Sequence, residues 1–300
     1  MEFQKFQLEK NITNEGNSIE RVDELNDGRL LVSGGLGSLS IYNISDSDFW
    51  KKEVSLFLGY IVSYKQLKSG NIVACNYQGL MGFFNLKGDI VQSIKYEQSE
   101  RENFIDELSN GQLIAFDFYG KTSLYDNING QYKRVKSFQK IKNFQTHSVI
   151  DLNNGKIVLH GWNISTKDYP AFLFDLNNLT FRTIKDNCIS VDLMENGNLV
   201  IFTEETVEIF NIENFNTLSV LKVPDNFKIK CSCLYDNHTI FLGNENKEVY
   251  EFLIKDNQLV QVDKFNVKCE LRDYVDQIIK LKNGKVIFIA CTEVYLYKPI

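Results

Sequence analysis

One short phrase recurs seven times along the chain and constrains its fold more than any other feature. Each copy starts with a large apolar or aromatic residue. One variable residue follows, then Asn, Asp or Ser, and six of the copies end in glycine. The last positions of the copies are Gly28, Gly70, Gly111, Gly155, Gly197, His238 and Gly284, so successive copies lie 42, 41, 44, 42, 41 and 46 residues apart. A repeat of this length is typical of proteins built from stacked or circularly arranged structural units.

The phrase has the chemistry of a β-hairpin turn. Asn-Gly and Asp-Gly accept the positive φ that tight turns between antiparallel strands require. An apolar, often β-branched run follows each copy, as at residues 30–32 and 286–288, and predicts a strand buried on both faces. A third strand ends in an aromatic residue followed by Asn or Asp in five copies, as in Tyr42-Asn43, and a fourth strand, as at residues 52–58, is more polar.

Four strands per unit of 40–45 residues and seven units predict an all-β fold, a seven-bladed β-propeller with four-stranded antiparallel blades. The chain is expected to form a single domain over residues 1–300, with blades at about 19–58, 61–96, 103–139, 146–186, 188–223, 229–265 and 275–300. The seventh copy stops after its third strand, whereas residues 2–11 resemble a fourth strand. The N-terminal strand is therefore expected to complete blade 7, which removes an open sheet edge.

The repeat resembles the WD-repeat β-propeller family over essentially the full chain, as a degenerate member. That family ends the third strand of each blade in Trp-Asp, where this sequence has Tyr or Phe followed by Asn or Asp, as in Tyr125-Asp126. The Gly-His dipeptide of the family does not occur here. The resemblance implies a non-catalytic scaffold that takes part in protein assemblies, and it leaves the partner unspecified.

Composition narrows the classes of partner. The chain has 33 Lys and Arg against 39 Asp and Glu, a net charge of −6, which argues against general binding of nucleic acid or anionic membranes. The basic cluster of Lys133, Arg134, Lys136, Lys140 and Lys142 is interpreted as a solvated strand edge, with contact to nucleic acid or an acidic partner as the alternative. No apolar run is long enough to span a membrane. Six scattered cysteines without a CxxC motif indicate buried thiols, and hence a reducing, cytoplasmic location.

The sequence contains no recognisable catalytic or metal-binding motif. His147, His160 and His238 are far apart, and Gly34-Gly35-Leu36-Gly37 is followed by a strand, which predicts a hairpin turn and not a phosphate loop. Acidic residues precede several turns on the expected innermost strands: Asp23, Glu24, Asp106, Glu107, Asp151 and Asp192. They are interpreted as hydrogen-bonded or solvated carboxylates, partly offset by Lys65 and Lys280; a cation site is the alternative. We expect no catalytic residues, cofactor or metal.

The WD-repeat resemblance places two sets of loops on one end of the propeller. The loops between consecutive blades bring Tyr60, Arg101, Phe144, His147, Phe227 and Tyr274 to that end, and the loops between second and third strands bring Tyr77, Tyr119, Trp162 and Tyr169. Aromatic residues and Arg dominate interface energetics, and the longest insertion, residues 162–170, interrupts the repeat. The sequence therefore predicts a protein-binding or peptide-binding face here. The alternative is an enzyme or small-ligand binder that uses the mouth of the central channel.

Overall fold

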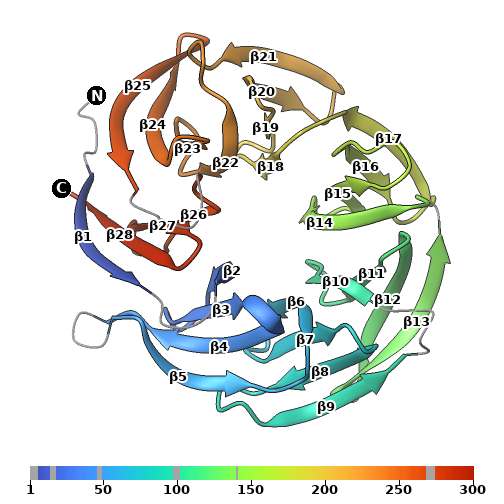
Figure 1. Cartoon of the computed structure of the whole chain (residues 1–300). Coiled ribbons are helices and arrows are strands. Elements are labelled where there is room, and N and C mark those ends of the chain that lie inside the picture. Colours follow the sequence, from blue (N-terminus) through green and yellow to red (C-terminus); the bar gives the residue numbers. More distant parts are fainter. Residues whose placement is uncertain (1–5, 14–17, 46–48, 97–101, 140, 268–273) are drawn as a thin grey trace. The chain divides into compact units, whose positions relative to one another are not determined.

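The computed structural model describes residues 6–13, 18–45, 49–96, 102–139, 141–267 and 274–300. The chain is an all-β, seven-bladed propeller, and each blade is a four-stranded antiparallel sheet (Figure 1). This confirms the predicted fold class. Two compact parts are present, residues 1–24 with 188–300 and residues 25–187.

In residues 25–187, the first blade contributes β3 (Leu30–Gly34), β4 (Ser38–Asn43) and β5 (Lys51–Leu56), which follow β2 (Ile19–Glu24) in the sheet order. The second blade contains β6 (Ile61–Gln66), β7 (Ile72–Asn76), β8 (Leu80–Phe84) and β9 (Ile90–Lys95). The third contains β10 (Glu102–Glu107), β11 (Leu113–Asp117), β12 (Lys121–Ile128) and β13 (Gln131–Gln139). The fourth contains β14 (Phe144–Asp151), β15 (Lys156–Asn163), β16 (Ala171–Asp175) and β17 (Thr180–Lys185).

The other part holds the last three blades. The fifth contains β18 (Ser190–Leu193), β19 (Leu199–Phe202), β20 (Thr206–Asn211) and β21 (Asn216–Lys222). The sixth contains β22 (Ile229–Leu234), β23 (Thr239–Asn244), β24 (Glu248–Lys255) and β25 (Gln258–Asn266). The seventh contains β26 (Gln277–Lys280), β27 (Val286–Ala290) and β28 (Glu293–Pro299), and β1 (Phe6–Thr13) is its fourth strand.

The N-terminal strand completes the seventh blade, as the sequence predicts. β1 pairs with β28 antiparallel, from Phe6 opposite Pro299 to Thr13 opposite Glu293, with a bulge between Leu8 and Lys10 (Figure 1). Phe6 is buried, and its ring packs edge-on against Tyr235 and Phe241 of blade 6. Closure therefore satisfies the backbone of β28 and also extends the apolar core of this part of the chain.

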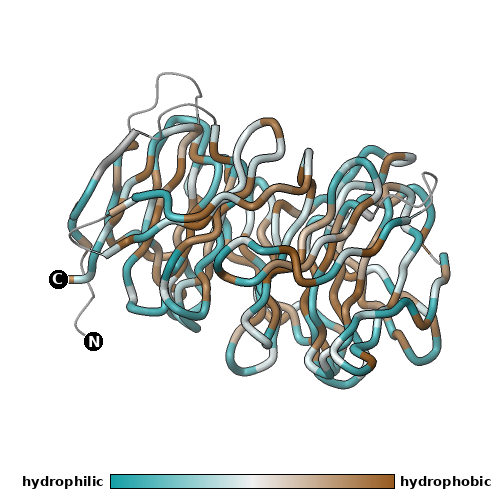
Figure 2. The backbone as a smooth tube through the Cα atoms, turned by 90° about the horizontal axis from the view of Figure 1, so that it is seen from below, coloured by the Kyte–Doolittle hydropathy of each residue, from teal (hydrophilic) through white to brown (hydrophobic). Residues whose placement is uncertain are grey.

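The second strand of each blade forms the core. All residues of β3, β7, β11 and β27 are buried, which explains their continuous apolar runs. The outer strands are largely exposed, as in β17, and Figure 2 shows hydrophobic residues concentrated in the strands and hydrophilic ones in many connecting turns. The Gly34–Gly37 segment is a short turn between β3 and β4, so the predicted hairpin is confirmed.

The described cysteines are free thiols, as expected. Cys75, Cys188, Cys231 and Cys291 are buried and Cys233 is partly buried, while Cys269 lies outside the described residues. Burial raises the pKa of Cys233 to about 12 and raises that of Cys231 as well. These thiols are therefore kept in their protonated, unreactive form.

Candidate functional site

The turns between second and third strands share a side-chain cap that positions their exposed residues. In blade 3, the Asp117 carboxylate accepts hydrogen bonds from the backbone N–H groups of Tyr119 and Lys121, both at 2.8 Å. Asn76 caps the blade 2 turn through Gln78 and Leu80 in the same way, and Asn244 caps the blade 6 turn. These three capping side chains are buried, so the two residues that follow each of them are held at the surface.

Backbone hydrogen bonds connect these turns to the connections between blades. In residues 25–187, the Tyr77 N–H donates to the Tyr60 carbonyl oxygen at 2.8 Å, and the Asn143 N–H donates to the Tyr119 carbonyl oxygen at 2.8 Å. Ile164 of the blade 4 insertion donates to Asn143 at the same distance. Backbone hydrogen bonds therefore join turn and connection at blade 2, and again at blades 3 and 4. We call the described turns and connections at this end of residues 25–187 the rim.

Close backbone approach at the rim requires glycine at two positions. Gly37 has φ +70, and a Cβ there would lie 2.5 Å from the Ile61 nitrogen. Gly120 has φ +88, and a Cβ there would lie 2.1 Å from the Ile141 carbonyl oxygen. Any larger residue would both strain the turn and push the neighbouring connection away.

Three of the aromatic residues predicted for the binding face lie on this rim and are exposed. Tyr60 and Tyr77 stand edge to face, with ring centroids 6.4 Å apart. Tyr119 is 57% exposed and packs against Phe118, with ring centroids 5.6 Å apart. The structure thus brings Tyr60 and Tyr77 together, as the sequence analysis assumed for loops of the two sets.

The blade 4 insertion forms an aromatic cluster. Tyr169 contacts Trp162 with ring centroids 4.7 Å apart, His147 at 5.8 Å and His160 at 6.5 Å. The surrounding rings limit the hydration of His147 and hold its pKa below the usual value, although part of its imidazole reaches solvent. The insertion is fixed by the Asn163 side chain, which accepts the Ser165 N–H at 3.0 Å.

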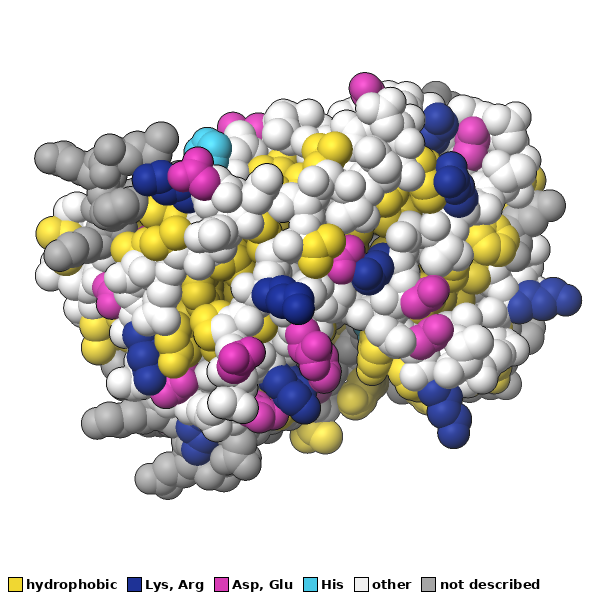
Figure 3. All heavy atoms as spheres, turned by 90° about the horizontal axis from the view of Figure 1, so that it is seen from above, with side chains coloured by type: hydrophobic (Ala, Val, Ile, Leu, Met, Phe, Trp, Pro, Cys, Tyr) yellow, Lys and Arg dark blue, Asp and Glu magenta, His cyan; other side chains and the backbone are white. Residues whose placement is uncertain are grey.

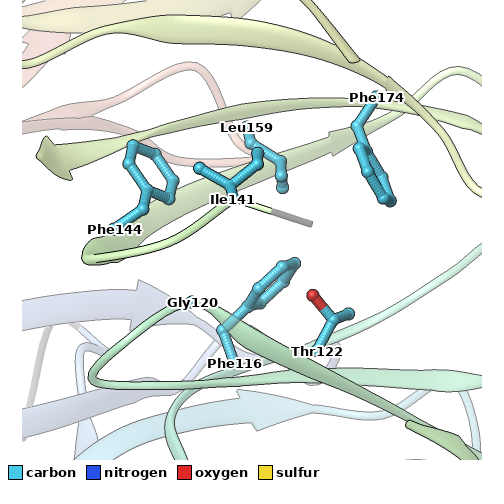
Figure 4. Close-up of a pocket in the computed structure, with 7 residues that line it drawn as sticks. All are labelled: Phe116, Gly120, Thr122, Ile141, Phe144, Leu159 and Phe174. Atoms are coloured by element: carbon cyan, nitrogen blue, oxygen red, sulfur yellow. The ribbon is translucent and has the colours of Figure 1, made fainter. Parts of the chain in front are cut away.

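Two predicted face residues lie in the core instead. Phe144 is buried and, with Phe116 and Leu159, lines a narrow gap between blades 3 and 4 (Figure 4). Phe227 is buried against Tyr250 and Phe252. Phe144 is the first residue of β14, and Phe227 lies two residues before β22. Both therefore stand at the start of an inner strand, which packs against the neighbouring blade. The prediction that these two reach a surface is corrected.

The described structure does not assign two further predicted residues to the rim of residues 25–187. Tyr274 is partly exposed and belongs to the other part of the chain. Arg101 lies outside the described residues.

Three exposed apolar residues of the rim were missed by the sequence analysis. Leu36 and Phe57 are each 80% exposed, in the β3–β4 turn and the β5–β6 connection, and Phe118 is exposed beside Tyr119. The signal that could have found Phe118 is the Asx-x-x-Gly spacing of Asp117 to Gly120, which repeats Asn76 to Gly79.

In residues 188–300 the equivalent turns are polar. The β19–β20 turn contains Glu204 and Glu205, and the Ile229 N–H donates to the Glu204 carbonyl oxygen at 3.0 Å. The β23–β24 turn exposes Glu245 and Asn246, and the Val267 N–H donates to the Lys247 carbonyl oxygen at 2.9 Å. In both blades the segment after the fourth strand donates an N–H to a carbonyl of the turn, as Asn143 does to Tyr119 at blade 3, while the exposed side chains differ. On the face drawn in Figure 3, acidic and basic side chains are interspersed without a large area of one sign.

The carboxylates before the turn phrases connect adjacent blades. Glu107 accepts the backbone N–H of Lys68 at 2.6 Å, and Asp151 accepts that of Ser109. Glu24 accepts the N–H of Lys282 at 2.7 Å, within residues 1–24 and 188–300. Each acceptor immediately precedes one copy of the phrase, and each donor is the second residue of the preceding copy. These carboxylates are hydrogen-bonded, in agreement with the interpretation preferred from the sequence.

The remaining inner-strand acids have other partners. Lys65 pairs with Asp106 at 2.7 Å, as their offsetting positions suggested, and Arg21 pairs with Asp23 at 2.9 Å. Burial raises the pKa of Asp192 to about 6, although its carboxylate accepts the Leu234 N–H at 3.3 Å. Among the described residues, no group of three or more His, Cys, Asp or Glu side chains is arranged to hold a metal ion. A membrane-spanning helix is likewise not found in the described ranges.

The blades, the capped turns and the closing strand together define a seven-bladed β-propeller. The fold is similar to the crystal structure of the WD40 β-propeller domain of Doa1, with a TM-score of 0.71 at 12% sequence identity, over 99% of this chain and 98% of that one. A likeness at this identity establishes the fold. No family model matches the sequence, and no curated protein matches it.

Proposed function

We propose that the chain is a non-catalytic, WD-repeat-like scaffold that binds a protein or peptide through one face of the propeller. The observation that carries this proposal is the set of exposed aromatic side chains held on the hydrogen-bonded rim of residues 25–187: Tyr60, Tyr77, Tyr119 and Tyr169, with the partly buried Trp162. Large aromatic side chains contribute most of the energy in protein interfaces because they bury much area and lose few rotamers.

The pre-formed geometry supports the same proposal. The rim is tied by backbone hydrogen bonds, so binding would order few additional groups. The similarity to a WD40 propeller supports descent from WD-repeat proteins, whose blades commonly act as interaction scaffolds. The free cysteines support work in a reducing, cytoplasmic compartment.

Affinity purification from the source organism's extract, with quantitative mass spectrometry, tests this function. The wild-type chain is compared with Tyr60→Ser/Tyr77→Ser/Tyr119→Ser and with the matched control Leu218→Ser/Val220→Ser, whose residues are similarly exposed on the outer strand β21. We expect a defined set of proteins that the first variant loses and the control retains. If the wild-type chain retains no protein above the level of an unrelated bait, or both variants retain the same set, the proposed function is wrong.

A further inference from the structure

Exposed apolar side chains occupy the rim over three consecutive blades. We call this set the apolar rim; its members are Leu36 of blade 1, Phe57 and Tyr60 of the β5–β6 connection, Tyr77 of blade 2, and Phe118 and Tyr119 of blade 3. Single exposed hydrophobic residues are ordinary, but contiguous ones on a soluble protein mark interaction surfaces. Four of the six form two pairs, since Tyr60 contacts Tyr77 and Phe118 contacts Tyr119 through their rings.

The architecture does not require these side chains. Blade 6 builds the same capped turn, with Asn244 in place of Asp117, and exposes Glu245 and Asn246 where blade 3 exposes Phe118 and Tyr119. The bonds that connect the turns to the neighbouring connections use backbone atoms in both cases. Because a polar pair serves the same turn equally well, the aromatic pair serves something other than the turn.

The charges around the apolar rim indicate what it contacts. The described turns that carry it, residues 35–37, 57–60, 77–79 and 118–120, contain no charged residue, whereas the connection between blades 2 and 3, residues 97–101, contains Glu97, Glu100 and Arg101 and lies outside the described residues. A charged group of a partner that covers these four turns would lose its hydration without gaining an ion pair from them, so we expect the residues in contact with them to be uncharged. At the blade 4 end, Lys142 and Lys167 are exposed, and the Ile164 N–H bond to Asn143 holds their two segments together.

We infer that the apolar rim docks an uncharged segment of a partner protein, rich in aromatic or large aliphatic residues, and that acidic residues at one end of this segment meet Lys142 and Lys167. The inference deepens the proposed function and rests on it. Apolar contacts supply the affinity, whereas the lysines fix the direction of the segment and add a salt-dependent contribution. The backbone hydrogen bonds of the rim hold the turns in place before binding.

Selection from a library of short random peptides displayed on phage tests this chemistry. Peptides are selected on immobilised wild-type protein, and the enriched ones are synthesised and measured by fluorescence anisotropy at low and high salt. We expect enriched peptides with at least two aromatic or large aliphatic residues followed or preceded by acidic residues. The variant Tyr77→Asn/Phe118→Asn/Tyr119→Asn should weaken their binding by about tenfold or more.

Two matched variants separate the contributions. Lys142→Gln/Lys167→Gln should reduce the salt dependence of binding and leave the apolar contribution in place. Leu218→Asn/Val220→Asn, on β21 in the other part of the chain, should bind as tightly as wild type, since these residues are exposed to a similar degree but lie on an outer strand. Thermal unfolding of all variants verifies that each remains folded.

Several results would overturn the inference. Enriched peptides that are basic or lack apolar residues would do so, as would equal binding by the wild-type chain and the apolar-rim variant. Ultracentrifugation showing a dimer that this variant abolishes would assign the rim to a second copy of the chain. Aromatic-dependent binding to phosphatidylcholine vesicles would assign it to a lipid surface. If extract proteins are lost by the Tyr60→Ser/Tyr77→Ser/Tyr119→Ser variant but no apolar peptide is enriched on the wild-type chain, the inference fails while the proposed scaffold function stands.

Discussion

Glu251 on β24 is a buried carboxyl group at a position that is apolar in the other six blades, and replacing it should stabilise the protein in a pH-dependent way. The equivalent residue is Ile, Leu or Phe elsewhere, as in Ile41 and Leu296. Glu251 is 2% exposed, and its Oε2 atom has no hydrogen-bond partner in the described structure. Burial, followed by repulsion from Asp263 and Asp236, raises its pKa from the usual 4.5 to about 7.

The size of the effect follows from this shift. A difference of 2.5 pKa units at 1.36 kcal/mol per unit corresponds to about 3 kcal/mol when the group is ionised in both states. When the pKa of a carboxyl group is higher in the folded than in the unfolded state, the group does not affect stability below its unfolded pKa. The protein then loses stability as the pH rises from the unfolded pKa through the folded pKa. The loss is therefore about 1 kcal/mol at pH 5 and about 3 kcal/mol at pH 8. Glu251→Gln keeps the shape and removes the titration, so its stability relative to wild type should rise by roughly 2 kcal/mol between these pH values.

Urea unfolding at low salt, followed by far-UV circular dichroism, measures this difference. The chain's two tryptophans, Trp50 and Trp162, lie in residues 25–187, so their fluorescence reports on that part alone, whereas circular dichroism also reports on blade 6. Glu248→Gln on the same strand is the control of opposite sign. The pKa of Glu248 is lowered, first by its hydrogen bond to Lys264. Wild type should therefore be more stable than this variant at neutral pH, and the difference in stability should disappear as the pH falls. Parallel pH profiles for wild type and Glu251→Gln would refute the reasoning.

Three further outcomes are expected. Glu107→Ala should lower the free energy of unfolding by about 1 kcal/mol because the Lys68 N–H, in an exposed turn, loses its acceptor, while Glu107→Gln should keep most of that stability; urea midpoints distinguish the two variants. Gly120→Ala should lower the free energy of unfolding more than Gly111→Ala, since both glycines have φ near +85 but only a Cβ at Gly120 would clash with a neighbouring carbonyl. Equal losses of stability would show that the neighbouring connection moves to accommodate the Cβ. In a Cys269→Ser background, native protein at pH 8 should react with a disulfide reagent far more slowly than urea-unfolded protein, and rapid native labelling would contradict the burial of the other thiols.

The sequence predicts the architecture well because the determinants are local. Each hairpin depends on a four-residue phrase whose glycine, as at Gly28 and Gly70, has positive φ in the structure. The seventh unit has only three strands of its own, and the N-terminal segment precedes the first unit. Pairing of this segment with β28 covers the open edge of the seventh sheet, and β1 pairs there. Strand count, order and closure thus follow from turn chemistry and from the cost of an open edge.

The candidate site is less predictable because exposure depends on register and on neighbouring blades. Phe144 begins β14 at the position that Ile61 and Ile229 occupy at the start of β6 and β22, and all three are buried. Comparison with these equivalent residues would have placed Phe144 in the core. Loop membership alone did not distinguish it from Tyr60, which precedes its strand by one residue and is exposed.

The repeat supplies its own reference state for both unusual features of this chain. Seven blades solve the same packing problem, so a residue type shared by all of them is explained by the architecture, and one confined to some of them is not. Glu251 places a carboxyl group in the core, where burial makes its ionised form unfavourable above neutral pH. Phe118 and Tyr119 place large rings on the surface where blade 6 has Glu245 and Asn246, and exposure of these rings to water is unfavourable until something covers them. Protonation relieves the first of these unfavourable states and a bound apolar segment would relieve the second, so the two respond to different perturbations and can be tested independently.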